Sequence, residues 1–137
     1  MTELALCGSR VGVVAQRSIL IVDDEPAVRS LLREIAEGLS IACQVYEAAD
    51  GQSALEIARW RHPDVVLLDI VLPGASTSGV LVCQELCRDN RTKVVIVSGN
   101  ENKTILRTCL SMGAADWVTK PFVPRDLRSK LMTWLAD

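Results

Sequence analysis

The sequence predicts a doubly wound α/β fold, in which one parallel β-sheet is covered by helices on both faces. Short apolar runs rich in β-branched residues recur along the chain, and segments with the helical spacing of apolar residues lie between them. The links between these segments are short. Strict alternation of strand and helix with short links indicates parallel strands joined by right-handed crossovers.

Five strands are expected. Four runs are apolar along their length, as in strands that are buried on both faces: Ile19 to Val22, Val65 to Leu68, Val94 to Val97 and the weaker Ala114 to Val118. The segment Cys43 to Ala48 is less apolar, which is typical of a strand nearer the edge of a sheet.

Five helices are expected between and after these strands. The first is Pro26 to Leu39, where Pro26 suits a first turn and Val28, Leu31, Leu32, Ile35 and Leu39 form one apolar stripe. Asp50 is a candidate cap for the second, and Gly113 is well placed to end the fourth. The remaining helices are predicted at Gln52 to Arg61, Val80 to Arg88, Lys103 to Met112 and Pro124 to Leu135.

Five such units suit the flavodoxin-like strand order 2-1-3-4-5. In sheets of this kind, ligands bind beyond the carboxyl ends of the strands. The polar residues at or just after those ends are Asp23, Asp24, Asp69, Ser98 and Lys120. Because strands one and three are neighbours in this order, the three aspartates should lie close together at one edge of the sheet.

Three clustered carboxylates need neutralisation. At an effective dielectric near 20, two unit charges about 4 Å apart interact by roughly 4 kcal/mol. Lys120 alone cannot offset three such charges. Hard oxygen ligands at a partly open site favour a divalent ion such as Mg²⁺, which also accepts phosphate oxygens. The cluster therefore predicts phosphoryl chemistry.

Asp69 is the best candidate for the residue that accepts a phosphoryl group. It ends the most apolar strand, so its side chain is held on a rigid element, whereas Asp23 and Asp24 share a turn suited to metal binding. Ser98 and Lys120 are candidates to hold phosphate oxygens. Each piece alone has an ordinary explanation, such as a helix cap or a turn, so the prediction depends on all five residues occurring together.

Four segments resemble successive motifs of the receiver domains of two-component response regulators. They are Ile19-Leu20-Ile21-Val22-Asp23-Asp24-Glu25-Pro26, Leu67-Leu68-Asp69-Ile70-Val71-Leu72-Pro73, Val97-Ser98-Gly99 and Lys120-Pro121-Phe122. The resemblance implies a receiver domain over residues 18–137, preceded by an N-terminal extension over residues 1–17.

The resemblance also implies the roles of the site residues. Asp69 would be the phosphoacceptor, with Ser98 as the hydroxyl switch residue and Lys120 as the phosphate-binding lysine. Mg²⁺ would be bound by Asp23, Asp24, Asp69 and the backbone carbonyl of Val71. The Lys120-Pro121 peptide bond would be cis. Trp117 stands where the family carries a switch aromatic, and core packing is the alternative interpretation of this residue.

The function that the resemblance implies is a phosphorylation-dependent signalling switch. A sensor histidine kinase or phosphotransfer protein would donate the phosphoryl group, and self-dephosphorylation would be the chain's only other chemistry. The output face would comprise Lys103 to Met112, Ala114 to Val118 and Pro124 to Leu135. It would act on a downstream effector protein or a fused output domain, and two copies would pair through it.

The sequence departs from the family pattern in the loop after Asp69. Residues Pro73 to Ser78 delay Gly79 by two positions, which makes this loop longer. Val71 and Asn100 lie at positions that resemble those influencing phosphoryl lifetime by placing the attacking water. Since Val71 offers that water no hydrogen bond, we expect slow self-dephosphorylation.

Two rival functions come from other classes of protein. A phosphohydrolase of the haloacid dehalogenase type also uses an aspartate nucleophile with Mg²⁺, but it resembles Asp-x-Asp, and Val71 stands in the place of the second acid here. A non-phosphorylated docking module with the same fold would usually lack one acid or the lysine. All of those residues are present in this chain.

Composition narrows the setting. The chain has 15 basic and 17 acidic residues, so we expect no direct binding of nucleic acid. No apolar stretch reaches the roughly eighteen residues that cross a bilayer, and the start does not resemble a signal peptide, so a cytoplasmic location is expected. Cys83 and Cys87 lie one helical turn apart, and we interpret them as small buried apolar residues instead of metal ligands.

Overall fold

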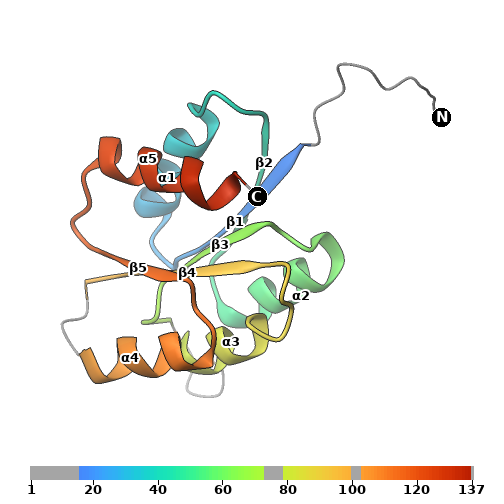
Figure 1. The fold of residues 1–137 in the computed structure, drawn as a ribbon, viewed down its shortest axis with the longest axis vertical. Helices are drawn as coiled ribbons and strands as arrows, with labels where there is room; N and C mark the ends of the chain where they lie inside the picture. Colours follow the sequence, from blue (N-terminus) through green and yellow to red (C-terminus); the bar gives the residue numbers. More distant parts are fainter. Residues whose placement is uncertain (1–15, 73–78, 100–102, 137) are drawn as a thin grey trace.

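A computed structural model describes residues 16–72, 79–99 and 103–136 of the chain. Their elements are β1 (Arg17–Val22), α1 (Pro26–Glu37), β2 (Cys43–Ala48), α2 (Gly51–Arg61), β3 (Val65–Leu68), α3 (Gly79–Leu86), β4 (Lys93–Ser98), α4 (Lys103–Met112), β5 (Asp116–Thr119) and α5 (Pro124–Leu135). All neighbouring strands are parallel, in the order β2-β1-β3-β4-β5 (Figure 1). The prediction of a doubly wound sheet in the order 2-1-3-4-5 is confirmed.

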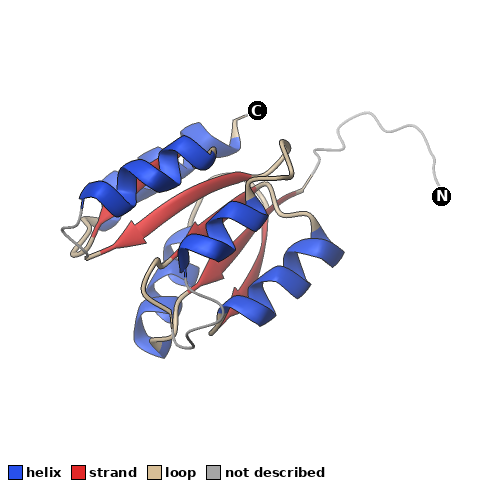
Figure 2. Cartoon of the chain, turned by 90° about the horizontal axis from the view of Figure 1, so that it is seen from below, coloured by secondary structure: helices blue, strands red, loops and turns tan. Residues whose placement is uncertain are grey.

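The sheet separates two helical layers (Figure 2). On one face, Ile19, Ile21 and Leu67 pack with residues of α1 and α5. On the other, Leu20 and Leu68 pack with residues of α2, α3 and α4. Successive side chains of a strand point to opposite faces, so a continuous apolar run supplies both cores. Full burial of such a side chain contributes about 1.5–3 kcal/mol, which holds the strand ends in register.

Several element ends differ from the sequence prediction. The first helix ends at Glu37 instead of Leu39, because the N–H of Leu39 bonds to the carbonyl of Ala36, three residues back, and the pattern of bonds four residues back stops there. Leu39 is nevertheless buried, whereas Leu31 of the predicted apolar stripe is 38% exposed. The third helix likewise ends at Leu86, short of the predicted Arg88.

The last strand begins and ends later in the sequence than predicted. It begins at Asp116, and Ala114 is a buried residue before it instead of its first member. Gly113, with φ at +119°, ends α4 as predicted and redirects the chain. The predicted cap of α2 is also present, since a carboxylate oxygen of Asp50 accepts a hydrogen bond from the Ser53 N–H at 2.8 Å.

Across the ranges that the structure describes, each helix is too short or too polar to cross a membrane.

Candidate functional site

The carboxyl ends of the adjacent strands β1 and β3 bring the predicted acidic residues together. The register pairs Val22 of β1 with Leu68 of β3, and the N–H of Asp69 donates to the Val22 carbonyl at 2.9 Å. One carboxylate oxygen from each of Asp23, Asp24 and Asp69 lies within 4.8 Å of the others. Asp23 and Asp69 are buried, and Asp24 is exposed. The cluster therefore has a rigid inner part and an edge open to solvent.

Lys120 reaches into this cluster from the segment after β5. Its Nζ donates to Asp23 Oδ2 at 2.8 Å and to Asp69 Oδ2 at 3.3 Å. A third carboxylate oxygen, Oε1 of Glu25, lies 4.0 Å away. The Lys120-Pro121 peptide bond is cis, as the resemblance implied. Burial by itself would lower the pKa of Lys120, but the bond to Asp23 and the charges of Asp69 and Asp23 raise it, so the lysine remains a cation.

The pKa of Asp69 is shifted by the groups around it. Burial raises the pKa of Asp69, and the charge of Asp23 adds to the increase. The N–H of Val71 donates to Asp69 Oδ1 at 2.9 Å, and together with Lys120 it opposes the increase without cancelling it. The ionised form of Asp69 is therefore less stable than that of a free aspartate, which is typical of a functional carboxylate.

An open hollow of about 490 Å³ lies above these groups. Its walls come from residues that the sequence singled out and from two neighbours of them, namely Asp24, Glu25, Asp69, Val71, Ser98, Gly99 and Lys120. Ser98 is 4% exposed at the end of β4, whereas Val71 is 62% exposed. The structure thus places Asp24, Asp69, Ser98 and Lys120 around one solvent-accessible space, with Asp23 buried beside them.

The donor set of this hollow fits Mg²⁺. Its ligating atoms are hard carboxylate oxygens, and the site is open enough for an ion that keeps several waters. Three aspartates face a single lysine, so a divalent cation would restore the local charge balance. Among the described residues, no other set of three His, Cys, Asp or Glu side chains is arranged to hold a metal ion.

Arg29 is a site neighbour that the sequence reasoning missed. Its Nη1 donates to the backbone carbonyl of Asp23 at 2.6 Å, and its Nε donates to Glu47 Oε1 at 3.1 Å. The N–H of Glu25, also missed, donates to Asp23 Oδ1 at 2.9 Å. The sequence gives no sign that Arg29 contacts Asp23. The side chain is oriented by Glu47 of β2, which is distant from it in the sequence.

Trp117 lies on β5 and is 38% exposed. Core packing was the alternative to a switch role, and the structure does not place this side chain in either core. It lines a hollow of about 300 Å³ together with Pro121, Val123 and Lys130. The switch role stays a prediction. Two other features of the prediction, Asn100 and the loop 73–78, lie outside the described residues.

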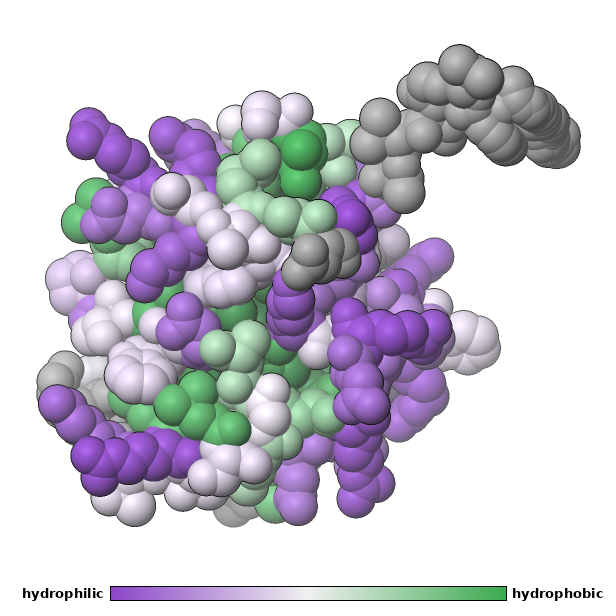
Figure 3. All heavy atoms as spheres, in the orientation of Figure 1, coloured by the Kyte–Doolittle hydropathy of each residue, from purple (hydrophilic) through white to green (hydrophobic). Residues whose placement is uncertain are grey.

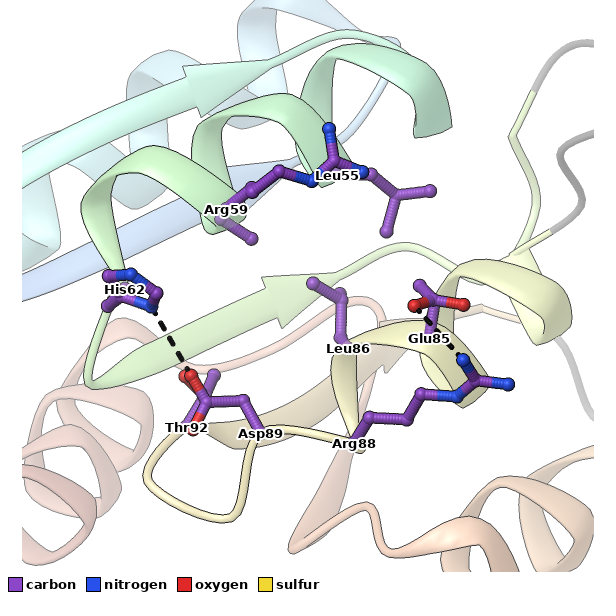
Figure 4. A pocket seen from close by; sticks show the side chains of 9 residues that line it. Leu55, Arg59, His62, Glu85, Leu86, Arg88, Asp89 and Thr92 are labelled. Atoms are coloured by element: carbon purple, nitrogen blue, oxygen red, sulfur yellow. Dashed lines mark ion pairs between the residues drawn. The ribbon is translucent and has the colours of Figure 1, made fainter.

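A separate cavity of about 280 Å³ lies between α2 and α3 (Figure 4). His62 pairs with Asp89 and Arg88 pairs with Glu85, so much of its charge is internally balanced. His62 and Asp89 precede β3 and β4, at the opposite edge of the sheet from Asp69. This cavity therefore does not belong to the acidic site.

The neighbouring cysteines are consistent with their interpretation as small apolar residues. The sulfur atoms of Cys83 and Cys87 lie 3.9 Å apart, and Cys83 is fully buried. Burial raises the pKa of both thiols, which disfavours the thiolate that binds metals.

The chain belongs to the response regulator receiver domain family, whose model matches residues 19–132. Members of this family are phospho-accepting regulators of two-component systems. The resemblance stated from the four sequence motifs is therefore confirmed.

Individual relatives agree with this assignment. The phosphate regulon transcriptional regulatory protein PhoB of Pseudomonas aeruginosa is 38% identical over 120 residues, which cover 84% of this chain and 50% of PhoB. The DNA-binding response regulator MtrA of Mycolicibacterium smegmatis is 34% identical over 116 residues, covering 85% of this chain and 49% of MtrA. The chain thus spans about half the length of the curated relatives it matches.

A solved structure shows the same fold. The CheY-like receiver domain protein from Methanospirillum hungatei superposes with a TM-score of 0.80 at 25% identity, covering 89% of this chain and 95% of that one. The name of PhoB describes a transcriptional regulatory protein, and the name of MtrA describes a DNA-binding response regulator. The expectation of no direct binding to nucleic acid was drawn for this chain alone. It does not apply to the full-length relatives, which are about twice as long.

Proposed function

We propose that this chain is a phosphorylation-dependent signalling switch that accepts a phosphoryl group on Asp69 from a sensor histidine kinase or phosphotransfer protein. The observation that carries the proposal is the position of Asp69. Its buried carboxylate lies 3.3 Å from Lys120 and beside the oxygens of Asp23 and Asp24, at the floor of an open hollow. A phosphoryl group entering the hollow would meet a carboxylate nucleophile and a cation together.

In the proposed reaction, a carboxylate oxygen of Asp69 forms a bond to phosphorus while the bond from phosphorus to the donor's imidazole nitrogen breaks. The product is an acyl phosphate on Asp69, and the donor histidine leaves with the electron pair. Lys120 stays protonated and can balance charge on the phosphoryl oxygens. Mg²⁺, held by Asp23, Asp24, Asp69 and the Val71 carbonyl, would supply further neutralising charge.

The consequence of phosphorylation is a shift between two conformations. Phosphorylation replaces the single charge of the Asp69 carboxylate with a phosphoryl group that carries between one and two negative charges. We expect the Ser98 hydroxyl and Lys120, which line the hollow, to respond to this charge. We propose that the response reaches the face formed by α4, β5 and α5, with Trp117 as the switch aromatic on β5. A downstream effector protein or a fused output domain would recognise this face, and two copies would pair through it.

The proposal is tested by incubating the protein with Mg²⁺ and acetyl phosphate or phosphoramidate and measuring its intact mass. We expect the parent to gain one phosphoryl group and Asp69→Asn to gain none. Asp89→Asn is a matched control, because it removes an aspartate from the opposite edge of the sheet and should leave the gain unchanged.

Other outcomes would support the rival functions. A parent protein that gains no phosphoryl group would be a non-phosphorylated receiver-like docking module. Continuous release of phosphate from general monoesters would indicate a hydrolase of the haloacid dehalogenase type.

A further inference from the structure

Each polar group of Asp23 has a bonding partner. Its N–H donates to the Ala48 carbonyl at 3.1 Å, and its two carboxylate oxygens accept from the Glu25 N–H and from Lys120. The carbonyl oxygen accepts from Arg29 Nη1 at 2.6 Å. Four bonds from four elements or turns thus hold Asp23 in place, with its carboxylate beside those of Asp24 and Asp69.

Within the described part of the chain, two side chains bond Asp23. Lys120 bonds its carboxylate, whereas Arg29 bonds only its backbone carbonyl. The Arg29 side chain is 18% exposed. Its Nε is occupied by Glu47 on the edge strand β2, and Glu47 also accepts from Arg33 Nε. Because the bonds from Arg33 and Arg29 lower the pKa of Glu47, this carboxylate stays ionised and keeps Arg29 oriented.

We propose that Arg29 is a positioning residue for Mg²⁺ binding, which holds the Asp23-Asp24 turn in the conformation that presents both carboxylates, with Glu47 anchoring it from β2. This inference depends on the proposed function, since it concerns the metal of that site. Arg29 itself contacts neither the phosphoryl group nor the metal. It acts through the carbonyl of Asp23, as groups behind a metal ligand commonly do.

Arg33 provides a matched control one helical turn further along α1. It also bonds Glu47, but its other contacts are the Val45 carbonyl and Glu37, and no bond joins it to Asp23. Loss of either arginine removes a cation from the same carboxylate. Only the loss of Arg29 releases the turn that carries Asp23 and Asp24.

The experiment measures the dissociation constant of Mg²⁺ by isothermal titration calorimetry without any phosphoryl donor, alongside the thermal midpoint of each variant. Arg29→Gln should weaken Mg²⁺ binding on the order of tenfold, the lower end of the effect seen when a group behind a metal ligand is lost. Arg33→Gln should change it by less than about twofold, with a similar or larger loss of thermal stability than Arg29→Gln.

Arg29→Lys distinguishes positioning from general stabilisation. An ammonium group can bond either the Asp23 carbonyl or Glu47, but it lacks the planar fork that reaches both. Mg²⁺ affinity should therefore be intermediate in this variant. It also provides a folded protein if Arg29→Gln is too unstable to study.

Equal Mg²⁺ affinity in the parent and both Arg29 variants would overturn the inference, as would an equal loss in Arg33→Gln. A parent protein that binds no Mg²⁺ would contradict the proposed function as well. A parent that binds Mg²⁺ and is phosphorylated, with unaffected Arg29 variants, would contradict the role of Arg29 alone.

Discussion

Asp69 is a buried carboxylate placed between a lysine that stabilises its charge and an aspartate that destabilises it. Its pKa is raised because burial and Asp23 outweigh the bonds from Val71 and Lys120. A site selected for stability alone would not place such a group beneath an open hollow. The same features that weaken the folded state favour the acceptance of a phosphoryl group, so at this residue function and stability are opposed.

Because burial of the Asp69 carboxylate destabilises the folded protein, we expect Asp69→Asn to stabilise the metal-free protein at pH 7. A carboxyl with a raised pKa binds its proton more tightly in the folded state than in the unfolded state. Its contribution to the unfolding free energy is therefore largest at acid pH and falls as pH rises through the folded-state pKa. We expect a gain on the order of 1 kcal/mol, or about 3 °C, measured by thermal unfolding in a chelating buffer.

This gain should diminish as the pH is lowered below about 4, where the carboxyl is protonated in both states. A variant less stable than the parent at pH 7 would show that the bonds from Val71 and Lys120 outweigh the burial of the charge.

We expect the apolar side chain of Val71 to lengthen the lifetime of the phosphorylated state. The side chain is exposed on the wall of the hollow and gives an attacking water no hydrogen bond. Val71→Asn should accelerate loss of the phosphoryl group by roughly fivefold, which corresponds to one hydrogen bond of about 1 kcal/mol. The decay of intact phosphorylated mass in Mg²⁺ measures this rate. An unchanged rate would remove Val71 from the control of dephosphorylation.

At the scale of elements, α3 begins where the backbone makes a very close contact. A Cβ at Gly79 would lie 2.1 Å from the carbonyl oxygen of Ile70, a distance that no side chain tolerates. Gly79 thus lets the start of α3 approach the segment that follows Asp69. The two-residue delay in sequence is compatible with this contact.

Gly79→Ala should consequently destabilise the protein by about 2–4 kcal/mol, because backbone must move to admit the methyl group. Gly99→Ala is the control, since its Cβ would meet Lys120 at an ordinary 3.7 Å. Urea unfolding of both variants measures the difference. Equal stabilities would mean that α3 shifts without cost.

Helix α1 and strand β2 are joined by Glu47. Bonds from Arg33 and Arg29 lower its pKa, so its contribution to stability is complete above its unfolded-state pKa and is lost as pH falls through the lower folded-state value. Glu47→Gln should cost about 0.5–1 kcal/mol at pH 7, since the pair is partly exposed to solvent. Unfolding measured from pH 7 to pH 3 should show parent and variant converging, and a constant difference would argue against an electrostatic origin.

At the scale of the whole molecule, charge is unevenly distributed. Lys103, Arg107, Arg125, Arg128 and Lys130 belong to α4 and α5, against the carboxylates of Asp116 and Asp126 on β5 and α5. Hydrophilic side chains are present over both helices in Figure 3, among apolar ones. The face proposed for output therefore carries a net positive charge, although the whole chain has a net charge of −2.

This distribution predicts how two copies would pair through that face. Like charges would meet, so any such pairing should strengthen as salt rises from about 0.05 M to about 0.5 M, because salt screens the repulsion. Sedimentation equilibrium of the phosphorylated protein at both salt concentrations tests this expectation. Pairing that weakens with salt would show that the copies meet through another face or through complementary charges.

The periodicity of apolar residues was sufficient to predict the strand order and the edge of the sheet at which Asp23, Asp24, Asp69 and Lys120 meet. It was sufficient because continuous apolar runs and short links leave few other topologies. The tertiary structure decided where β5 begins, that Leu31 is exposed, and that Arg29 bonds the carbonyl of Asp23. These features depend on contacts between residues far apart in the chain, such as Arg29 with Glu47. Such contacts cannot be predicted from the pattern of neighbouring residues.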